Sequence, residues 1–175
     1  RREMKIKMRK LRLSITLLGV FGIGGMYIYI LKQIIRYEMN SRKKFQGLYN
    51  VLLQWLMLKY HASKMAGYFE HNGYERIAVY GMTPLADCLY EELKDTDVHI
   101  EYFIDKNFDK SGEPTRAGID VVGIEGAIIH GNIDVIIVTV ISQIDNIKKS
   151  LRHVGIEIPI IPISEVIMYY SKIHQ

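Results

Sequence analysis

The C-terminal part of the chain alternates short apolar runs with amphipathic segments. Apolar runs rich in β-branched residues occupy positions 76–80, 98–104, 119–122, 134–140 and 157–161. The segments between and after them carry apolar residues at helical spacing, chiefly at 84–94, 124–129, 142–153 and 164–170. Strands that alternate with helices in this way build a parallel sheet with right-handed crossovers. We therefore predict for residues 73–175 an α/β, Rossmann-like, doubly wound domain whose five parallel strands lie in the order 3-2-1-4-5.

A long apolar run stands near the start of the chain. Residues 13–31 read LSITLLGVFGIGGMYIYIL and carry no charge, and a helix of this length can cross a hydrocarbon layer of roughly 30 Å. Three interpretations remain open: a spanning helix, a re-entrant or interfacial helix, and a helix buried on a soluble core. Basic residues flank the run on both sides, so the positive-inside rule gives no clean orientation. We assign residues 1–44 to these basic flanks and the candidate membrane helix, with membrane lipid as an expected partner.

A second apolar helical pattern, a helical arm, covers residues 45–72. Too much of the circumference of this arm is apolar for a helix that is covered on one side only. It therefore needs cover from the α/β domain, from lipid, from a protein partner or from self-association.

Charge and cysteine content narrow the function classes. The net charge is +4, and seven of the basic residues precede the first apolar run, where such residues meet anionic lipid. Direct nucleic-acid binding is therefore not expected. Cys88 is the one cysteine, which excludes an intrachain disulfide and a cysteine-rich metal site and fits a reducing compartment.

The first strand of the α/β pattern runs directly into the turn Gly81-Met-Thr-Pro-Leu-Ala86. In dinucleotide folds the first glycine permits the tight turn, the second lets the backbone approach phosphate, and the third allows close packing of helix on strand. Here Gly81 and Ala86 suit the first and third positions, but Thr83 replaces the second and Pro84 removes an amide donor. The helix N-terminus still offers other amides and its dipole, and Thr83 offers a hydroxyl, so we predict that an anion binds there.

Polar residues at the ends of other strands are expected at the same crevice. Asp105 ends the second strand, where a carboxylate grips a ribose diol, although an Asp at a strand end is also an ordinary turn residue. Thr139 and Ser142 follow the fourth strand and would line the same crevice. These positions favour a nucleotide with its ribose near Asp105.

Catalytic and metal chemistry find little support in the sequence. Tyr90 and Lys94 have the spacing of the Tyr–Lys pair of short-chain dehydrogenases and epimerases, but they lie on the first helix, where an ordinary i,i+4 pair is expected. The six histidines show no metal-ligand spacing, and no carboxylate pair or serine elbow is recognisable. We expect no catalytic residues and no metal site.

The strings IAVYGMTPLADCLYEEL and VHIEYFIDKN, followed by GIDVVGIEG and DVIIVTV, carry a resemblance. They are similar to the Rossmann-like nucleotide-sugar-binding domains of bacterial cell-surface polysaccharide biosynthesis proteins. These include the N-terminal domain of sugar O-acyltransferases and the nucleoside-diphosphate-sugar-binding domain attached to phosphoglycosyl transferases and glycosyltransferases. The usual turn of that family, YGxGxxG, implies that Gly81, Thr83, Ala86, Asp105 and Asn107 face the ligand here. The hexapeptide-repeat domain of the acyltransferases is not found in this sequence, so their activity is not implied.

Together these features predict a non-catalytic, membrane-associated module that binds a nucleotide or nucleotide sugar in bacterial capsule or other surface-polysaccharide biosynthesis. A UDP-sugar or NAD is the expected ligand, and the α/β domain is expected on the cytoplasmic side. Two alternatives remain: an NAD-dependent sugar-nucleotide epimerase or dehydratase, and a structural interaction module with a degenerate site. The expected nucleotide-binding residues are Gly81, Met82, Thr83, Pro84, Leu85, Ala86, Asp105, Lys106, Asn107, Thr139 and Ser142.

Overall fold

In the computed structural model the backbone is described for residues 2–60, 64–108, 115–129 and 132–173, and the side chains of 2–22 and 170–173 are not described. The chain divides into two units, Arg1–Phe45 and Gln46–Gln175. The first unit is helical, and the second contains the sheet.

One continuous helix, α1 (Arg2–Tyr60), contains both the apolar run of residues 13–31 and the first part of the predicted arm. The described part of that run keeps its large side chains exposed, with Tyr27 63% and Met26 66% exposed. Residues 13–22 of the run lie outside the described side chains. Among the residues that could be searched, no helix is long and apolar enough to cross a membrane.

A six-stranded sheet forms the centre of the second unit, in the order β3-β4-β2-β1-β5-β6. Five of these strands run parallel to one another: β1 (Arg76–Tyr80), β2 (His99–Ile104), β4 (Ile119–Val122), β5 (Val135–Val138) and β6 (Ile160–Pro162). The predicted mixed α/β class is confirmed.

The expectation of a five-stranded, wholly parallel sheet was wrong at one edge. A two-residue strand, β3 (Thr115–Arg116), pairs antiparallel with β4. Ala117 and Gly118 connect the two strands with φ of 52° and 78°, as a two-residue hairpin turn requires. The segment reads as a loop in the sequence because a strand of two residues has no measurable periodicity.

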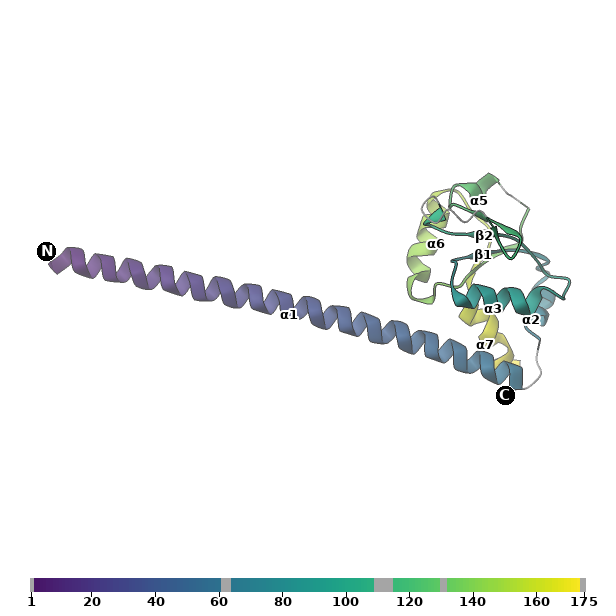
Figure 1. The fold of residues 1–175 in the computed structure, drawn as a ribbon, viewed down its shortest axis with the longest axis horizontal. Helices are drawn as coiled ribbons and strands as arrows, with labels where there is room; N and C mark the ends of the chain where they lie inside the picture. The colour runs from purple at the N-terminus through teal and green to yellow at the C-terminus, as the bar shows by residue number, and fades with distance from the viewer. Residues whose placement is uncertain (1, 61–63, 109–114, 130–131, 174–175) are drawn as a thin grey trace. The chain divides into compact units, whose positions relative to one another are not determined.

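Helices cover both faces of the sheet (Figure 1). One face packs against α2 (Ala66–Asn72), α3 (Pro84–Leu93), α7 (Ile163–Ile173) and the end of α1. The other packs against α5 (Gly126–Ile129) and α6 (Ile144–His153), with the short helix η1 (Ile141–Gln143) before α6. Alternate residues of each strand serve the two faces: Ile77 and Val79 of β1 belong to the first core, and Ala78 and Tyr80 to the second. Burial on both faces explains why these strands are nearly continuous apolar runs.

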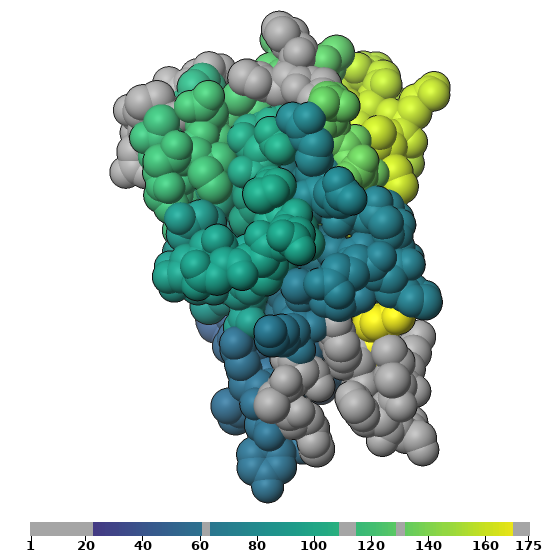
Figure 2. Space-filling model, turned by 90° about the vertical axis from the view of Figure 1, so that its right-hand side faces the viewer, coloured from purple at the N-terminus to yellow at the C-terminus, as the bar shows by residue number. Residues whose placement is uncertain are grey.

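The last turns of α1 are part of the α/β unit. Val51, Trp55 and Leu58 are buried, and Val51 and Trp55 belong to the core on the first face of the sheet. Trp55 Nε1 donates to Glu92 Oε1 over 3.4 Å, and Lys59 Nζ lies 2.5 Å from the same oxygen. Figure 2 shows this end of α1, in blue, reaching the surface beside the teal residues of α3. The inner side of the predicted arm is therefore covered by the α/β domain.

Tyr68, the buried tyrosine of α2, lowers the unfolding free energy of the protein at alkaline pH. Burial raises the pKa of the Tyr68 phenol to about 12, and the charge of Glu165 adds to the shift. The unfolded chain releases this proton near pH 10, so the contribution of Tyr68 is complete below pH 10 and is lost as the pH rises towards 12. We expect Tyr68→Phe to reduce the fall in unfolding free energy between pH 10 and 12, measured by urea unfolding. Tyr37→Phe, at a side chain 77% exposed, is the control, and an equal effect of both changes would contradict this assignment.

Candidate functional site

The turn after β1 is held in a conformation that glycine favours. Gly81 has a φ of 101°, and its N–H donates to Ile104 O over 2.8 Å, which joins the ends of β1 and β2. A Cβ at this position would stand 2.4 Å from Val140 Cγ2 and 3.0 Å from Thr139 Oγ1. The close approach of the β5 end to the turn therefore requires glycine both for its backbone angle and for its lack of a side chain.

Helix α3 begins directly after this turn, with Thr83 as its N-cap residue. Thr83 has extended backbone angles, but its side chain makes no capping hydrogen bond. Its Oγ1 is the one buried side-chain polar atom without a hydrogen-bond partner among the described residues. Buried hydroxyl groups are normally paired, so an unpaired one is a candidate to hydrogen-bond a bound group. Thr83 therefore brings an unused hydroxyl to the N-terminal end of α3.

The rest of the predicted turn serves mainly to start and to pack the helix. Pro84 occupies the first turn of α3, where its missing N–H costs nothing, and it is exposed. Leu85 and Ala86 are buried in the first core, and Met82 packs against that core as a partly buried side chain. The amides of Gly81, Met82, Ala86 and Asp87 already donate to protein oxygens, so the Thr83 hydroxyl is the clearest group that remains to meet an anion.

Asp105 is brought to the turn from the end of β2. Its Oδ2 accepts a hydrogen bond from the Met82 N–H over 3.3 Å, and its Oδ1 accepts one from the Asn107 N–H over 2.6 Å. The charge also acts on Tyr80: burial raises the pKa of the Tyr80 phenol, and Asp105 raises it further. Asp105 thus shapes its own loop and ties that loop to the glycine turn, while each carboxylate oxygen keeps a second lone pair.

The other predicted residues take different positions around this edge. The Thr139 hydroxyl is buried and lies 3.0 Å from both Tyr80 O and Gly81 O. Its single proton can be donated to either carbonyl, and this hydrogen bond holds the turn against the end of β5. Ser142 is exposed on η1, and Lys106 and Asn107 are exposed in the loop after β2. Contact of these four residues with a ligand stays a prediction.

Two contributors to the edge carry no signal in the sequence. Val140 closes the space under Gly81. A Cβ at Gly47 of α1 would stand 3.9 Å from Ile141 Cγ2, and Leu48, Met82 and Ile141 pack against the same core. The last part of α1 therefore passes the same edge of the sheet as the glycine turn, a long-range contact that no local pattern predicts.

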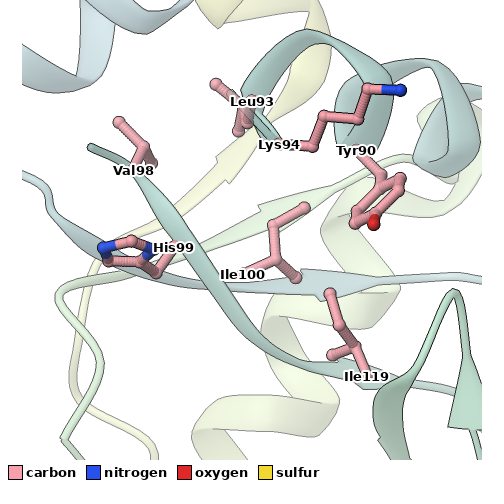
Figure 3. Close-up of a pocket in the computed structure, with 7 residues that line it drawn as sticks. All are labelled: Tyr90, Leu93, Lys94, Val98, His99, Ile100 and Ile119. Carbon is pink, nitrogen blue, oxygen red and sulfur yellow. The ribbon is translucent and has the colours of Figure 1, made fainter. Parts of the chain in front are cut away.

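A hollow lies towards the other end of α3 (Figure 3). It has a volume of about 160 Å³, and its lining comes from the end of α3 and from β2 and β4: Tyr90, Leu93, Lys94, Val98, His99, Ile100 and Ile119. In Figure 3 the Tyr90 ring, Ile100 and Ile119 turn towards one another, whereas the Lys94 ammonium points away. Lys94 Nζ instead pairs with Glu91 over 2.6 Å. Tyr90 and Lys94 are therefore not arranged as a proton-transfer pair.

Metal-binding chemistry finds no support in the described parts of the chain. Among these residues, no group of three or more His, Cys, Asp or Glu side chains is placed to hold a metal ion. Cys88 is exposed on α3. The candidate site is thus the Gly81–Ala86 turn, with the Thr83 hydroxyl and the nearby carboxylate of Asp105.

Comparison with known proteins places the sheet domain in a family. No curated protein matches the chain. Residues 73–161, just over half of the 175 residues, match the family described as C2185-like, N-terminal. The matched region runs from the start of β1 to β6 and so contains the glycine turn, Asp105 and Thr139. The chain belongs to the C2185-like, N-terminal family.

Proposed function

We propose that the sheet unit binds a nucleotide or nucleotide sugar, with a phosphate at the Gly81–Ala86 turn. The observation that carries this proposal is the buried, unpaired Thr83 hydroxyl at the N-cap of α3. An anionic oxygen beside it would accept that proton and would also meet the positive end of the helix dipole. The residues present fit a phosphate in this way, although Pro84 leaves fewer amides than a standard glycine-rich turn.

The sheet order supports the same location. The parallel strands lie as β4-β2-β1-β5-β6, and we take this arrangement as a Rossmann-like doubly wound sheet. In such sheets the direction of winding reverses beside β1, and ligands bind outside the carboxyl ends of the strands at that point. Gly81 follows β1, Asp105 follows β2 and Thr139 follows β5, so all three stand at this edge.

Asp105 is the residue that we assign to the sugar of the nucleotide. Its two oxygens already accept the N–H groups of Met82 and Asn107, which fixes the orientation of the carboxylate before a ligand arrives. The remaining lone pairs can accept from the hydroxyls of a ribose. A pre-oriented carboxylate loses little side-chain entropy on binding.

We further propose that the module is non-catalytic and works at the cytoplasmic face of a membrane in bacterial surface-polysaccharide assembly. The exposed apolar residues of the first unit, such as Ile23, Tyr27 and Ile34, lie close in sequence to Lys32, Arg36 and Arg42, as expected of a helix that meets anionic lipid. The polysaccharide setting rests on the resemblance of the glycine turn and its flanking strings.

The alternative enzyme, an NAD-dependent epimerase or dehydratase, has no support from the geometry. Tyr90 and Lys94 lie seven and eleven residues beyond Thr83, which places them roughly 10 and 16 Å along the helix from the turn. A tyrosine that transfers a proton needs its lysine and the substrate within hydrogen-bond reach, and Lys94 pairs with Glu91 instead.

Titration calorimetry of the full chain with UDP-glucose, NAD and coenzyme A tests this function. We expect saturable binding of one of them. Thr83→Val should weaken it about 10- to 150-fold through loss of one hydrogen bond to a charged oxygen, without lowering the stability of the free protein, because the hydroxyl is unpaired there. Thr83→Ser should retain most of the affinity.

Tyr90→Phe and Lys94→Ala are the matched controls on the same helix, and both should bind as the wild type does. Absence of saturable heat with all three probes would contradict the proposed function. Equal loss of affinity in the Thr83 and Lys94 variants would move the site to the hollow beside Tyr90.

A further inference from the structure

We propose that the outer face of α1, formed by Tyr49, Leu52, Leu53, Leu56 and Met57, pairs with the same face of a second copy of this chain. These five side chains are between 44% and 64% exposed. They belong to the second unit, whose sheet domain already covers the opposite side of the helix through Val51, Trp55 and Leu58. The outer face therefore remains available while the inner face stays packed, and this inference does not depend on nucleotide binding.

The spacing of the face suits a partner helix. Tyr49, Leu52 and Leu56 follow one another at intervals of three and four residues, which is the a/d repeat of a coiled-coil seam. Leu53 and Met57 widen this seam on one side, again four residues apart. A helix of a second copy presents the complementary knobs and holes by symmetry.

The amount of apolar surface meets the requirement of a dimer. Five large side chains at these exposures present roughly 100 Å² each, so two copies would bury about 1,000 Å² in total, the lower bound for a specific interface. Burial of apolar surface stabilises by about 25 cal/mol per Å², so removing this area from water favours the dimer.

The charges around the face favour a second copy over lipid. Within residues 46–60 the one charged side chain is Lys59, and it pairs with Glu92 of α3. The polar neighbours of the face are the neutral Gln46, Asn50 and Gln54. Helices that lie on anionic lipid carry lysine and arginine along their polar side, and this segment lacks them. A neutral face can meet its own copy without charge repulsion.

Light scattering of the full chain in a mild non-ionic detergent measures the mass directly. We expect about twice the 20.3 kDa of one chain for the wild type at tens of micromolar. Leu52→Glu combined with Leu56→Glu should yield the monomer mass, because four carboxylates would be buried together in the dimer. Ser150→Glu, at an exposed position of α6 on the other face of the sheet, should remain a dimer. Circular dichroism should show unchanged helix content in every variant, since these residues are exposed.

Cross-linking in lipid vesicles gives a second, independent readout. In a Cys88→Ser background, Leu56→Cys should form an intermolecular disulfide under mild oxidation, and Ser150→Cys on α6 should not. A monomeric wild type, or a dimer that survives the double glutamate change, would overturn the proposal. Loss of vesicle binding by the double variant, with no cross-link at Leu56→Cys, would also overturn it and would identify lipid as the cover.

Discussion

Replacement of Gly81 by alanine is expected to lower the free energy of unfolding by about 2 to 5 kcal/mol and to abolish ligand binding. The φ of 101° costs a side-chain-bearing residue about 1 to 2 kcal/mol. The new Cβ would stand 2.4 Å from Val140 Cγ2, and relief of such a clash in a packed region costs about 1 to 3 kcal/mol more. The movement needed to relieve it would displace the end of β5 and the hydroxyl of Thr139, which supports the turn.

Gly73→Ala is the matched control for this prediction. Gly73 also has a positive φ, 68°, but a Cβ there would meet nothing within 4 Å. It should therefore cost only the backbone term, about 1 kcal/mol. Urea unfolding followed by circular dichroism gives both values. Equal costs for the two glycines would show that Val140 does not close the space under the turn.

Truncation of Trp55 to alanine is expected to cost about 3 to 5 kcal/mol. Trp55 is 7% exposed and packs into the first core together with Val51 of α1 and residues of α3. Its loss should release the end of α1 from the sheet domain, which amide hydrogen exchange of residues 46–60 would detect as faster exchange. Unfolding should be followed by circular dichroism, because Trp55 is the single tryptophan of the chain and its replacement removes the tryptophan fluorescence signal.

Two further changes separate the causes of this loss. Trp55→Phe keeps most of the apolar area but loses the N–H that donates to Glu92, so it should cost about 1 kcal/mol. Asn50→Ala, at an exposed position of the same segment, should stay within about 0.5 kcal/mol of the wild type. If Trp55→Ala were equally mild, the end of α1 would not be part of the α/β unit.

The parallel strands could be predicted from the sequence because both faces of the sheet are buried. Ile136, Ile137 and Val138 of β5 are each fully buried, and such a strand must be apolar at every position. The small strand β3 could not be predicted, since two residues carry no period. The apolar run and the first part of the arm lie on one helix, α1, because no proline interrupts residues 2–60.

The sequence predicts which residues of the candidate site meet at one edge of the sheet, because these residues follow the ends of parallel strands. Asp105 and the glycine turn were expected at one edge, and a hydrogen bond from Met82 to Asp105 joins them there. The direction of individual side chains was not accessible. The Thr139 hydroxyl turns to the carbonyls of Tyr80 and Gly81, and Val140 and Ile141 bring the β5 end to the turn and to α1. These are contacts across long stretches of sequence, which local patterns do not encode.

Hydrogen exchange of the full chain, with and without a saturating concentration of the probe that calorimetry identifies, tests the central claim most directly. A phosphate held by the N-terminal amides of α3 and a ribose held by Asp105 should slow exchange in residues 81–87 and 105–108 together, because bound amides exchange only when the ligand leaves. The segment 90–100 beside the hollow of Tyr90 and Ile100 should exchange as before. Unchanged exchange in residues 81–87 under saturating ligand, or slowing confined to residues 90–100, would contradict the assignment of the nucleotide to the glycine turn.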